Sequence, residues 1–174
     1  FGDADAMRDA VDEDTGGIIV EPVQGEGGVN VPPPGYLTGL REIADEKGLL
    51  LILDEIQTGI GRTGTMFACE QEGVTPDVML LGKCLGSGFP VGALLVTEAV
   101  SRTIQKGDHG GTYAGNPLAC AAVVAVLEEL ADGSILANAR AMGALAMQRF
   151  EALRADLPGK IVDVRGAGLL VGCE

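Results

Sequence analysis

The chain has 174 residues, of which 47% are hydrophobic and 21% charged, a composition typical of a globular protein rather than a disordered one. Its 25 acidic and 12 basic residues give a formal net charge of −13, which argues against nucleic acid as a partner. No apolar run approaches the ~20 residues that a membrane helix needs, so we expect no membrane partner. Four cysteines without metal-like spacing and a single histidine, His109, predict no metal site.

The charged residues also bear on the source and the setting of the chain. Only four of the basic residues are lysines, and a strongly acidic, lysine-poor surface is one adaptation to concentrated salt, where screening removes repulsion. An ordinary acidic enzyme is the alternative.

Free thiols fit a reducing cytoplasm better than a disulfide framework. Because the sequence begins without methionine and stops within a pattern at Glu174, we expect an internal fragment of a longer protein.

Two apolar runs end at residues suited to chemistry. Residues 49–53 predict a strand buried on both faces of a parallel sheet, and Asp54 follows it. Residues 78–81 predict a second core strand, which is followed by Gly82 and Lys83. Because ligands bind at the carboxyl ends of strands in open α/β sheets, we expect this acid and this lysine at a binding edge.

The first part of the chain predicts a strand–helix–strand unit. Residues 16–20 read as a strand, and residues 36–47 as a helix with one apolar face and Gly48 as its C-terminal cap. Followed by the strand at 49–53, this unit implies parallel strands. Further on we expect short helices at 66–72 and 99–106 and a strand at 90–96.

The last part predicts two helices and a pair of strands. Asn116 as N-cap and Pro117 at the first position begin a helix reaching about residue 131, which is apolar almost all round and so expected to be buried. Ser134 is expected to cap a second helix reaching about residue 153. Strands are expected at 160–164 and 169–172, joined through residues 165–168.

The pairing of Asp54 with Lys83 suggests a specific cofactor. Burial depresses the pKa of a lysine and frees its amine to form a Schiff base. Pyridoxal phosphate needs such a lysine, together with an acid that keeps its pyridine nitrogen protonated. For an isolated pair of residues, a loop-capping Asp54 and a solvent-exposed Lys83 would be the simpler interpretation.

The surrounding motifs resemble the class III, ornithine-type aminotransferases, which are pyridoxal-phosphate enzymes of fold type I. The resemblance rests on residues 54–64 (DEIQTGIGRTG), on Thr75-Pro76-Asp77, and on Lys83 before a glycine-rich turn. It covers nearly the whole chain, with the motifs in family order. It implies an α/β fold with a central, mostly parallel sheet in a large domain and the start of a small C-terminal α+β domain. We expect residues 1–133 to belong to the large domain, and 134–174 to a linking helix and the small domain.

The resemblance also implies roles for single residues. In the family, the aspartate matching Asp54 pairs with the pyridine nitrogen, the residue matching Ile56 packs against the ring, and the glutamine matching Gln57 lies near the ring hydroxyl. The lysine matching Lys83 carries the internal aldimine and shuttles the proton. The threonine matching Thr112 reaches the cofactor phosphate of the partner subunit in a homodimer.

Two carboxylates on the loop after residue 20 are candidates for the substrate side. Glu21 and Glu26, separated by glycine, could bind a cationic group, and a polar turn is the alternative. In the family, the acid matching Glu26 lies near the amino-group side of the substrate. We further expect Arg62 to orient neighbouring acids. Cys84, after the lysine, replaces a more usual small residue or glycine.

Within the class, Gly61 before Arg62 and the segments 67–70 and 73–77 look most like acetylornithine aminotransferases. This implies transfer of the terminal amino group of acetylornithine, or of a related acyl-lysine, to 2-oxoglutarate in arginine or lysine biosynthesis. Ornithine or 4-aminobutyrate aminotransferase, a decarboxylase or mutase, and a non-catalytic paralogue remain alternatives, although Lys83 argues against the last. Because the family's glycine-rich phosphate loop and substrate arginine are not in the sequence, we expect the chain alone to be inactive.

Overall fold

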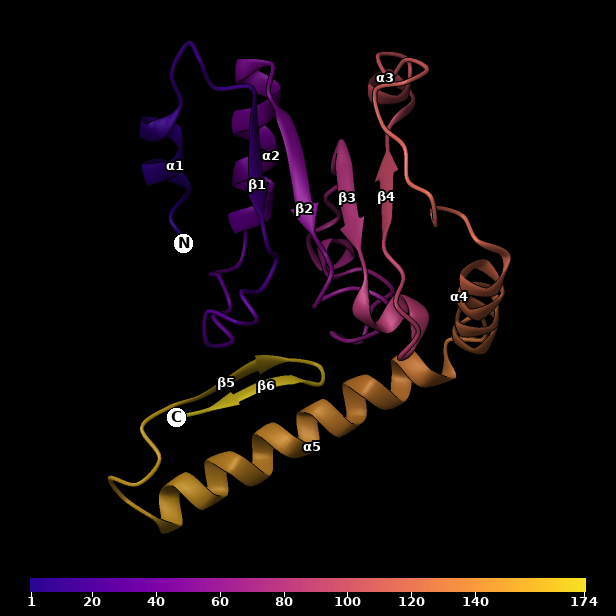
Figure 1. Cartoon of the computed structure of the whole chain (residues 1–174). Helices are drawn as coiled ribbons and strands as arrows, with labels where there is room; N and C mark the ends of the chain where they lie inside the picture. The colour runs from indigo at the N-terminus through magenta and orange to yellow at the C-terminus, as the bar shows by residue number, and fades with distance from the viewer.

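The computed structural model describes all 174 residues and shows an α/β arrangement (Figure 1). Its elements are α1 (Ala4–Ala10), β1 (Gly17–Val20), α2 (Tyr36–Lys47), β2 (Leu50–Asp54), β3 (Val78–Leu81), β4 (Ala93–Val96), α3 (Glu98–Ser101), α4 (Pro117–Leu130), α5 (Ser134–Asp156), β5 (Val164–Ala167) and β6 (Leu170–Cys173). Two 3-10 helices, η1 (Ala68–Glu72) and η2 (Lys83–Gly86), lie in the connections. None of the helices combines the length and the apolar character that crossing a membrane requires.

The main sheet has the strand order β1-β2-β3-β4, with the first three strands parallel and β4 antiparallel. This confirms the predicted mostly parallel sheet and the strand–helix–strand unit of β1, α2 and β2. Val20 is the register partner of Leu53, and Asp54 that of Leu80. The three parallel strands therefore end at the same edge of the sheet.

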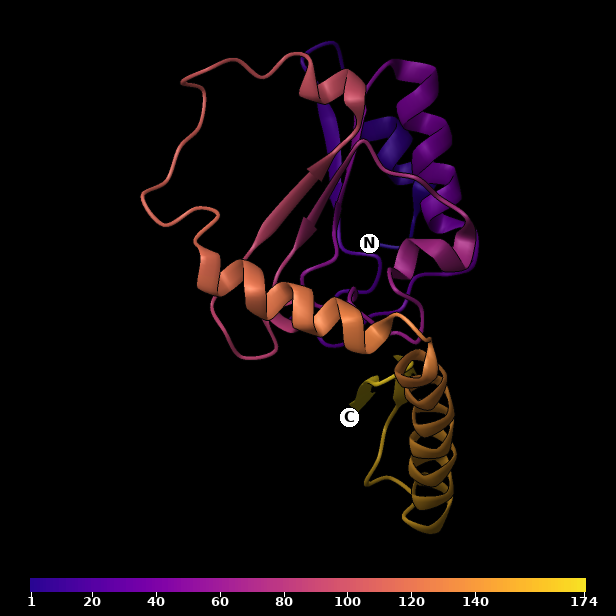
Figure 2. The same cartoon turned by 90° about the vertical axis from the view of Figure 1, so that its right-hand side faces the viewer.

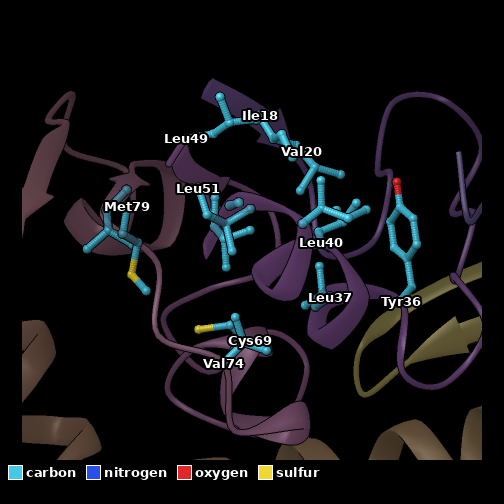
Figure 3. Packing of buried hydrophobic residues seen from close by; sticks show 14 of the residues in the cluster. Ile18, Val20, Tyr36, Leu37, Leu40, Leu49, Leu51, Cys69, Val74 and Met79 are labelled. Carbon is cyan, nitrogen blue, oxygen red and sulfur yellow. The ribbon is translucent and has the colours of Figure 1, made fainter. Parts of the chain in front are cut away.

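Helix α2 covers one face of this sheet. Its Leu37, Leu40 and Ile43 are almost fully buried and belong to one cluster with Leu51 and Leu53 of β2 (Figure 3). The helix ends at Gly48, which has the left-handed φ of 69° that a C-terminal cap of this kind requires. The predicted helix and its cap are confirmed.

The opposite face of the sheet is largely uncovered. Ile19 is 63% exposed and Leu50 is 39% exposed, while Ile52 is half-buried. The prediction that the strand near residues 49–53 is buried on both faces is therefore wrong for this chain. The physical reason is that α2, which contacts β1 and β2, lies on one side of the sheet only.

Helix α4 differs from the prediction in its burial. Its start is as expected, because Asn116 caps it by accepting a hydrogen bond from the Ala119 amide at 2.9 Å and Pro117 follows. Of its apolar side chains, however, only Ala119 and Leu130 are buried, and Leu118 is 67% exposed. The helix packs along one side on η2, so an all-round apolar surface did not lead to all-round burial.

The C-terminal part forms a helix and an antiparallel hairpin with bounds that correct the prediction. Gly133 is the N-cap of α5 instead of Ser134, and the carboxylate of Asp132 accepts from the Ser134 amide at 2.8 Å. The hairpin strands pair Val164 with Cys173 and Ala167 with Leu170, so residues 165–167, predicted as a connection, lie in β5. The turn follows instead at Gly168, because that glycine has a positive φ of 55°.

Other bounds shift by a few residues. The predicted helix at 66–72 is the 3-10 helix η1, the helix at 99–106 shortens to α3, and the strand at 90–96 begins only at Ala93. Such shifts are common because terminal turns are weakly held.

The hairpin lies between the carboxyl edge of the main sheet and α5 (Figure 1). Close backbone packing makes this possible, since a Cβ on Gly143 of α5 would lie 2.2 Å from the carbonyl oxygen of Gly168. The amide of Leu169 donates to the carbonyl of Arg62 at 2.9 Å. The hairpin is thus attached to the loop that follows β2.

Asp77 links α2 to the sheet and gives a prediction about acid stability. Burial raises the pKa of Asp77, but the hydrogen bond from Arg41, the amide of Leu51 and the Arg41 charge outweigh it, so the net pKa is lowered. Its contribution is therefore present above the unfolded pKa of about 3.9 and is lost as pH falls through the lower folded pKa. We expect Asp77→Asn to cost about 1–3 kcal/mol of unfolding free energy at pH 7 and much less near pH 2. Urea denaturation at both pH values checks this, and an equal cost at both would contradict it.

Cys69 gives a second prediction, about thiol reactivity. Burial in the core, followed by the nearby charge of Glu55, raises the pKa of Cys69 to about 12. At pH 8 only about one thiol in ten thousand would be the reactive thiolate. We expect a thiol reagent to label the exposed Cys120 and Cys173 at once and Cys69 only on unfolding. Peptide mass spectrometry reads this out, and rapid labelling of Cys69 in the folded protein would contradict the described burial.

Candidate active site

The candidate site lies where three parallel strands end. Glu21 follows β1, Asp54 is the last residue of β2, and Lys83 begins η2 two residues after β3 ends. The strand register brings these ends to one edge, as predicted. An acid and a lysine from sequence-distant segments therefore meet at one edge of the sheet.

Asp54 has one carboxylate oxygen free of the protein. Oδ1 accepts a hydrogen bond from the Ile56 amide at 3.0 Å, which fixes the side chain, whereas Oδ2 has no hydrogen-bond partner in the chain. The residue is half-buried and lines a cavity of about 490 Å³ together with Glu21 and Gln24. The free oxygen of a carboxylate held in this way can accept a proton or a hydrogen bond from a ligand.

Lys83 adopts an uncommon backbone conformation. Its φ is +43°, in the left-handed region that residues other than glycine rarely adopt. Backbone strain of this kind is found at functional sites, where the surrounding structure enforces it. The side chain is exposed, forms no ion pair or hydrogen bond, and lines a cavity of about 1000 Å³. The expectation that this lysine is buried is therefore wrong for this chain, although its amine has no partner in the chain and is open to a ligand.

Ile56 and Gln57 occupy the space beside these two residues. A Cβ on Gly82 would lie 3.3 Å from Cγ2 of Ile56, so the isoleucine packs against the residue before Lys83. Gln57 lines the same cavity as Lys83. A Cβ on Gly25 would lie 2.5 Å from the amide group of Gln57, so a larger residue there would displace the end of the Gln57 side chain. No sequence signal had indicated this contact.

Of the two substrate-side candidates, Glu21 is engaged and Glu26 is free. The Glu21 carboxylate accepts from the Gly25 amide at 3.0 Å and so closes a turn of its own loop. Glu26 is exposed and makes no side-chain hydrogen bond. The C-terminal hairpin also holds the loop that follows β1, because Nε of Arg165 in β5 donates to the carbonyl of Gly28 at 2.9 Å.

The prediction that Arg62 orients neighbouring acids is wrong. Its Nη2 donates to Sγ of Cys84 at 3.6 Å, and the residue takes part in no ion pair. The acid closest to it in the motif, Glu55, turns its carboxylate towards η1 instead. Arg62 therefore packs beside the turn that contains Lys83, and it forms no hydrogen bond with a neighbouring acid.

Thr112 lies apart from the other candidates. It is exposed, and the segment between α3 and α4 that contains it runs as an extended loop away from the sheet (Figure 2). His109, which lies in the same loop, is also exposed. The structure thus brings Ile56, Gln57 and Lys83 together and leaves Thr112 apart. Asp54 lies at the same sheet edge but lines a separate cavity. It contains no group of three or more His, Cys, Asp or Glu side chains that could hold a metal ion.

One buried residue of the site had no predicted role. Glu55 is only 1% exposed and accepts hydrogen bonds from the amides of Ala68 and Cys69 at 3.1 and 2.9 Å and from the Thr58 hydroxyl. An acid directly after a core strand, with a threonine three residues later, is the sequence signal that could have indicated it.

Comparison with known proteins places this arrangement in a family. Residues 2–174 match the family described as Aminotransferase class-III. The chain is 48% identical over its whole length to the acetylornithine aminotransferase of Methanosarcina mazei, of which it spans 43%.

Solved structures agree. The ornithine aminotransferase PY00104 from Plasmodium yoelii superposes with a TM-score of 0.94 at 38% identity, over 100% of this chain and 47% of that one. The ornithine aminotransferase from Toxoplasma gondii, crystallized in the presence of oxidized glutathione with partial occupancy of PLP at its active site, superposes with a TM-score of 0.92 at 44% identity, over 100% and 41% of the two chains. The α/β fold type I predicted from the sequence is confirmed. Because the family match extends over nearly every residue, the chain belongs to the class III aminotransferases.

Proposed function

We propose that the chain is part of a pyridoxal-phosphate-dependent aminotransferase that moves the terminal amino group of acetylornithine, or of a related acylated diamino acid, to 2-oxoglutarate. The observation that carries the proposal is that the free amine of Lys83 and the free oxygen of Asp54 lie at the same edge of the sheet, within a chain 48% identical throughout to acetylornithine aminotransferases. Ornithine is the second candidate donor, because the solved neighbours include ornithine aminotransferases at 38–44% identity.

The residues present fit pyridoxal phosphate. A lysine amine without an ion-pair partner suits the cofactor's carbonyl group, and a carboxylate with one unpaired oxygen suits a protonated pyridine nitrogen. Ile56, packed beside Gly82, offers an apolar surface of the kind on which a flat ring can rest. Gln57 supplies a polar amide for the ring hydroxyl. When bound, the cofactor supplies the electron sink that transamination requires.

Each residue of the proposed site then has its own role. Nζ of Lys83 binds the cofactor and moves the proton between the reacting carbon atoms, and Oδ2 of Asp54 holds the proton on the ring nitrogen. Glu26, and less directly Glu21, faces the amino-group side of the substrate. Leu169 and Leu170 of the hairpin line the cavity of Lys83 and add apolar surface to its wall.

We also propose the domain organisation, the oligomeric state and the pathway of the complete enzyme. The chain spans less than half of the relatives it matches, so the complete enzyme would supply further parts of the site. Residues 1–133 would form part of the cofactor-binding domain, and residues 134–174 the linking helix and the start of a small domain. Two copies would form a homodimer in which Thr112 serves the partner's cofactor phosphate. The proposed substrates suggest a place in arginine or lysine biosynthesis, and the free cysteines suggest the cytoplasm.

The test has two parts, both in the full-length enzyme that contains this chain. The first compares amino donors, and the second measures the effect of one substitution on kcat. We expect kcat/KM with 2-oxoglutarate to be highest for acetylornithine or an acyl-lysine and lower for ornithine and 4-aminobutyrate. Asp54→Asn should retain cofactor binding but lower kcat by about 100-fold or more, because the charge on the ring nitrogen is no longer held. The exposed Asp45→Asn on α2 is the matched control and should keep wild-type kcat. A wild-type kcat in Asp54→Asn, or no transfer from any of these donors, would contradict the proposal.

A further inference from the structure

The buried polar side chains of the chain are gathered in one place. They are Glu55, Thr58 and Thr63, at 1%, 0% and 4% exposure. The hydroxyl of Thr58 donates to the Glu55 carboxylate, and the hydroxyl of Thr63 donates to the Thr58 carbonyl at 3.3 Å. Thr58 and Thr63 belong to the loop of residues 56–67, which follows Glu55 directly and also contains Ile56 and Gln57. Buried polar networks with every donor satisfied make one local conformation rigid.

Glu55 is the centre of this network and has no cation to pair with. Both of its carboxylate oxygens accept from backbone amides at the start of η1, from Ala68 at 3.1 Å and from Cys69 at 2.9 Å, yet it takes part in no ion pair. Phe67, the N-cap of η1, provides no side-chain hydrogen bond, so Glu55 caps this helix from outside. Burying a carboxylate without a counter-charge is costly, and a neutral, well-packed residue would avoid that cost. A role beyond stability would explain its presence.

The main chain of Glu55 is held as firmly as its side chain. Its amide donates to the Leu80 carbonyl of β3 at 3.0 Å, and its carbonyl accepts from the Gly59 amide at 2.9 Å. A Cβ on Gly59 would lie 2.9 Å from that carbonyl, so glycine is needed for the contact. Both ends of the 56–67 loop are thus tied to one residue, which is itself tied to the strand that leads to Lys83.

We infer that Glu55 is a positioning residue for the cofactor site, one that holds Asp54, Ile56 and Gln57 in place relative to Lys83 through the η1 cap. This inference rests on the proposed function. Asp54 and Ile56 are the chain neighbours of Glu55, and Gln57 lies within the turn closed by the Glu55–Gly59 hydrogen bond. A displacement of about 1 Å at a reacting centre can cost about 100-fold in rate, so a residue that touches no ligand can control kcat.

Glu55→Gln is the informative substitution. Glutamine keeps the shape of the side chain but replaces one acceptor oxygen with a donor, which would face the amide of Ala68 or Cys69. Thr58→Val is the milder second variant, since it removes one donor to Glu55 and nearly preserves shape. It remains decisive if Glu55→Gln does not fold.

Glu72→Gln is a matched control within the same chain. Like Glu55, Glu72 accepts from two backbone amides and a threonine hydroxyl, those of Gly35 at 3.2 Å and of Thr38 at 3.0 and 3.2 Å. Glu72 is the last residue of η1, and these bonds join that end of η1 to the start of α2. The two substitutions therefore remove similar interactions, one at the end of η1 that adjoins the 56–67 loop and one at the opposite end.

The experiment compares these variants in the full-length enzyme loaded with pyridoxal phosphate. We expect Glu55→Gln to lower kcat about 10- to 100-fold with KM little changed, and to weaken the visible circular dichroism of the bound cofactor. Amide hydrogen exchange should become faster across residues 56–69. Thr58→Val should act in the same direction to a smaller extent. Glu72→Gln should reduce the melting temperature but leave kcat and the cofactor's circular dichroism unchanged.

Two results would overturn the inference. One is wild-type kcat and cofactor dichroism in both Glu55→Gln and Thr58→Val. The other is an equal loss in Glu72→Gln, which would make the effect a general consequence of losing a cap. Failure of the proposed function would be seen differently, because the wild-type enzyme would then show no amino transfer. In that case hydrogen exchange across residues 56–69 of the variants would still test whether Glu55 holds the loop in place.

Discussion

The register of the parallel strands is the constraint on which the candidate site depends. Because β1, β2 and β3 run in the same direction and are paired residue by residue, their carboxyl ends lie at one edge. Asp54 and Lys83 are far apart in sequence, yet the pairing of Asp54 with Leu80 brings both residues to the same edge of the sheet. A slip of one residue in β2 would turn Asp54 to the opposite face of the sheet and remove it from the site.

Around this edge, the loops are fixed by contacts that are mostly polar or that depend on glycine. The loop after β1 lies against Gln57 through Gly25, the loop after β2 is tied down by Glu55, and the C-terminal hairpin holds both loops through Arg165 and Leu169. The positive φ of Lys83 agrees with such fixed loops, because an unfavourable backbone conformation persists only where several surrounding contacts enforce it.

Much of the scaffold could be predicted from the sequence, and the failures have physical causes. Strong local signals such as the apolar run ending at Asp54, Gly48 after α2, and Asn116-Pro117 before α4 predicted elements that the structure confirms. The burial of α4 and of β2 was misjudged because burial depends on what packs against an element, which periodicity does not contain. Ser134 lost the cap position because Gly133 adopts the left-handed conformation before it and Asp132 takes over the side-chain bond. Gly25 could not be found because only the fold brings Gln57 to it. For Glu55, the threonine three residues later was a signal, but the η1 amides that it accepts from are brought to it only by the fold.

The central claim is that the amine of Lys83 is the group that binds the cofactor. Borohydride reduction of the full-length enzyme with bound pyridoxal phosphate makes the lysine–cofactor bond permanent, and peptide mapping then locates it. The account predicts the pyridoxyl group on Lys83 and on no other lysine, with no label at that position in Lys83→Ala. Stoichiometric labelling of a different lysine, with Lys83 unmodified, would contradict it.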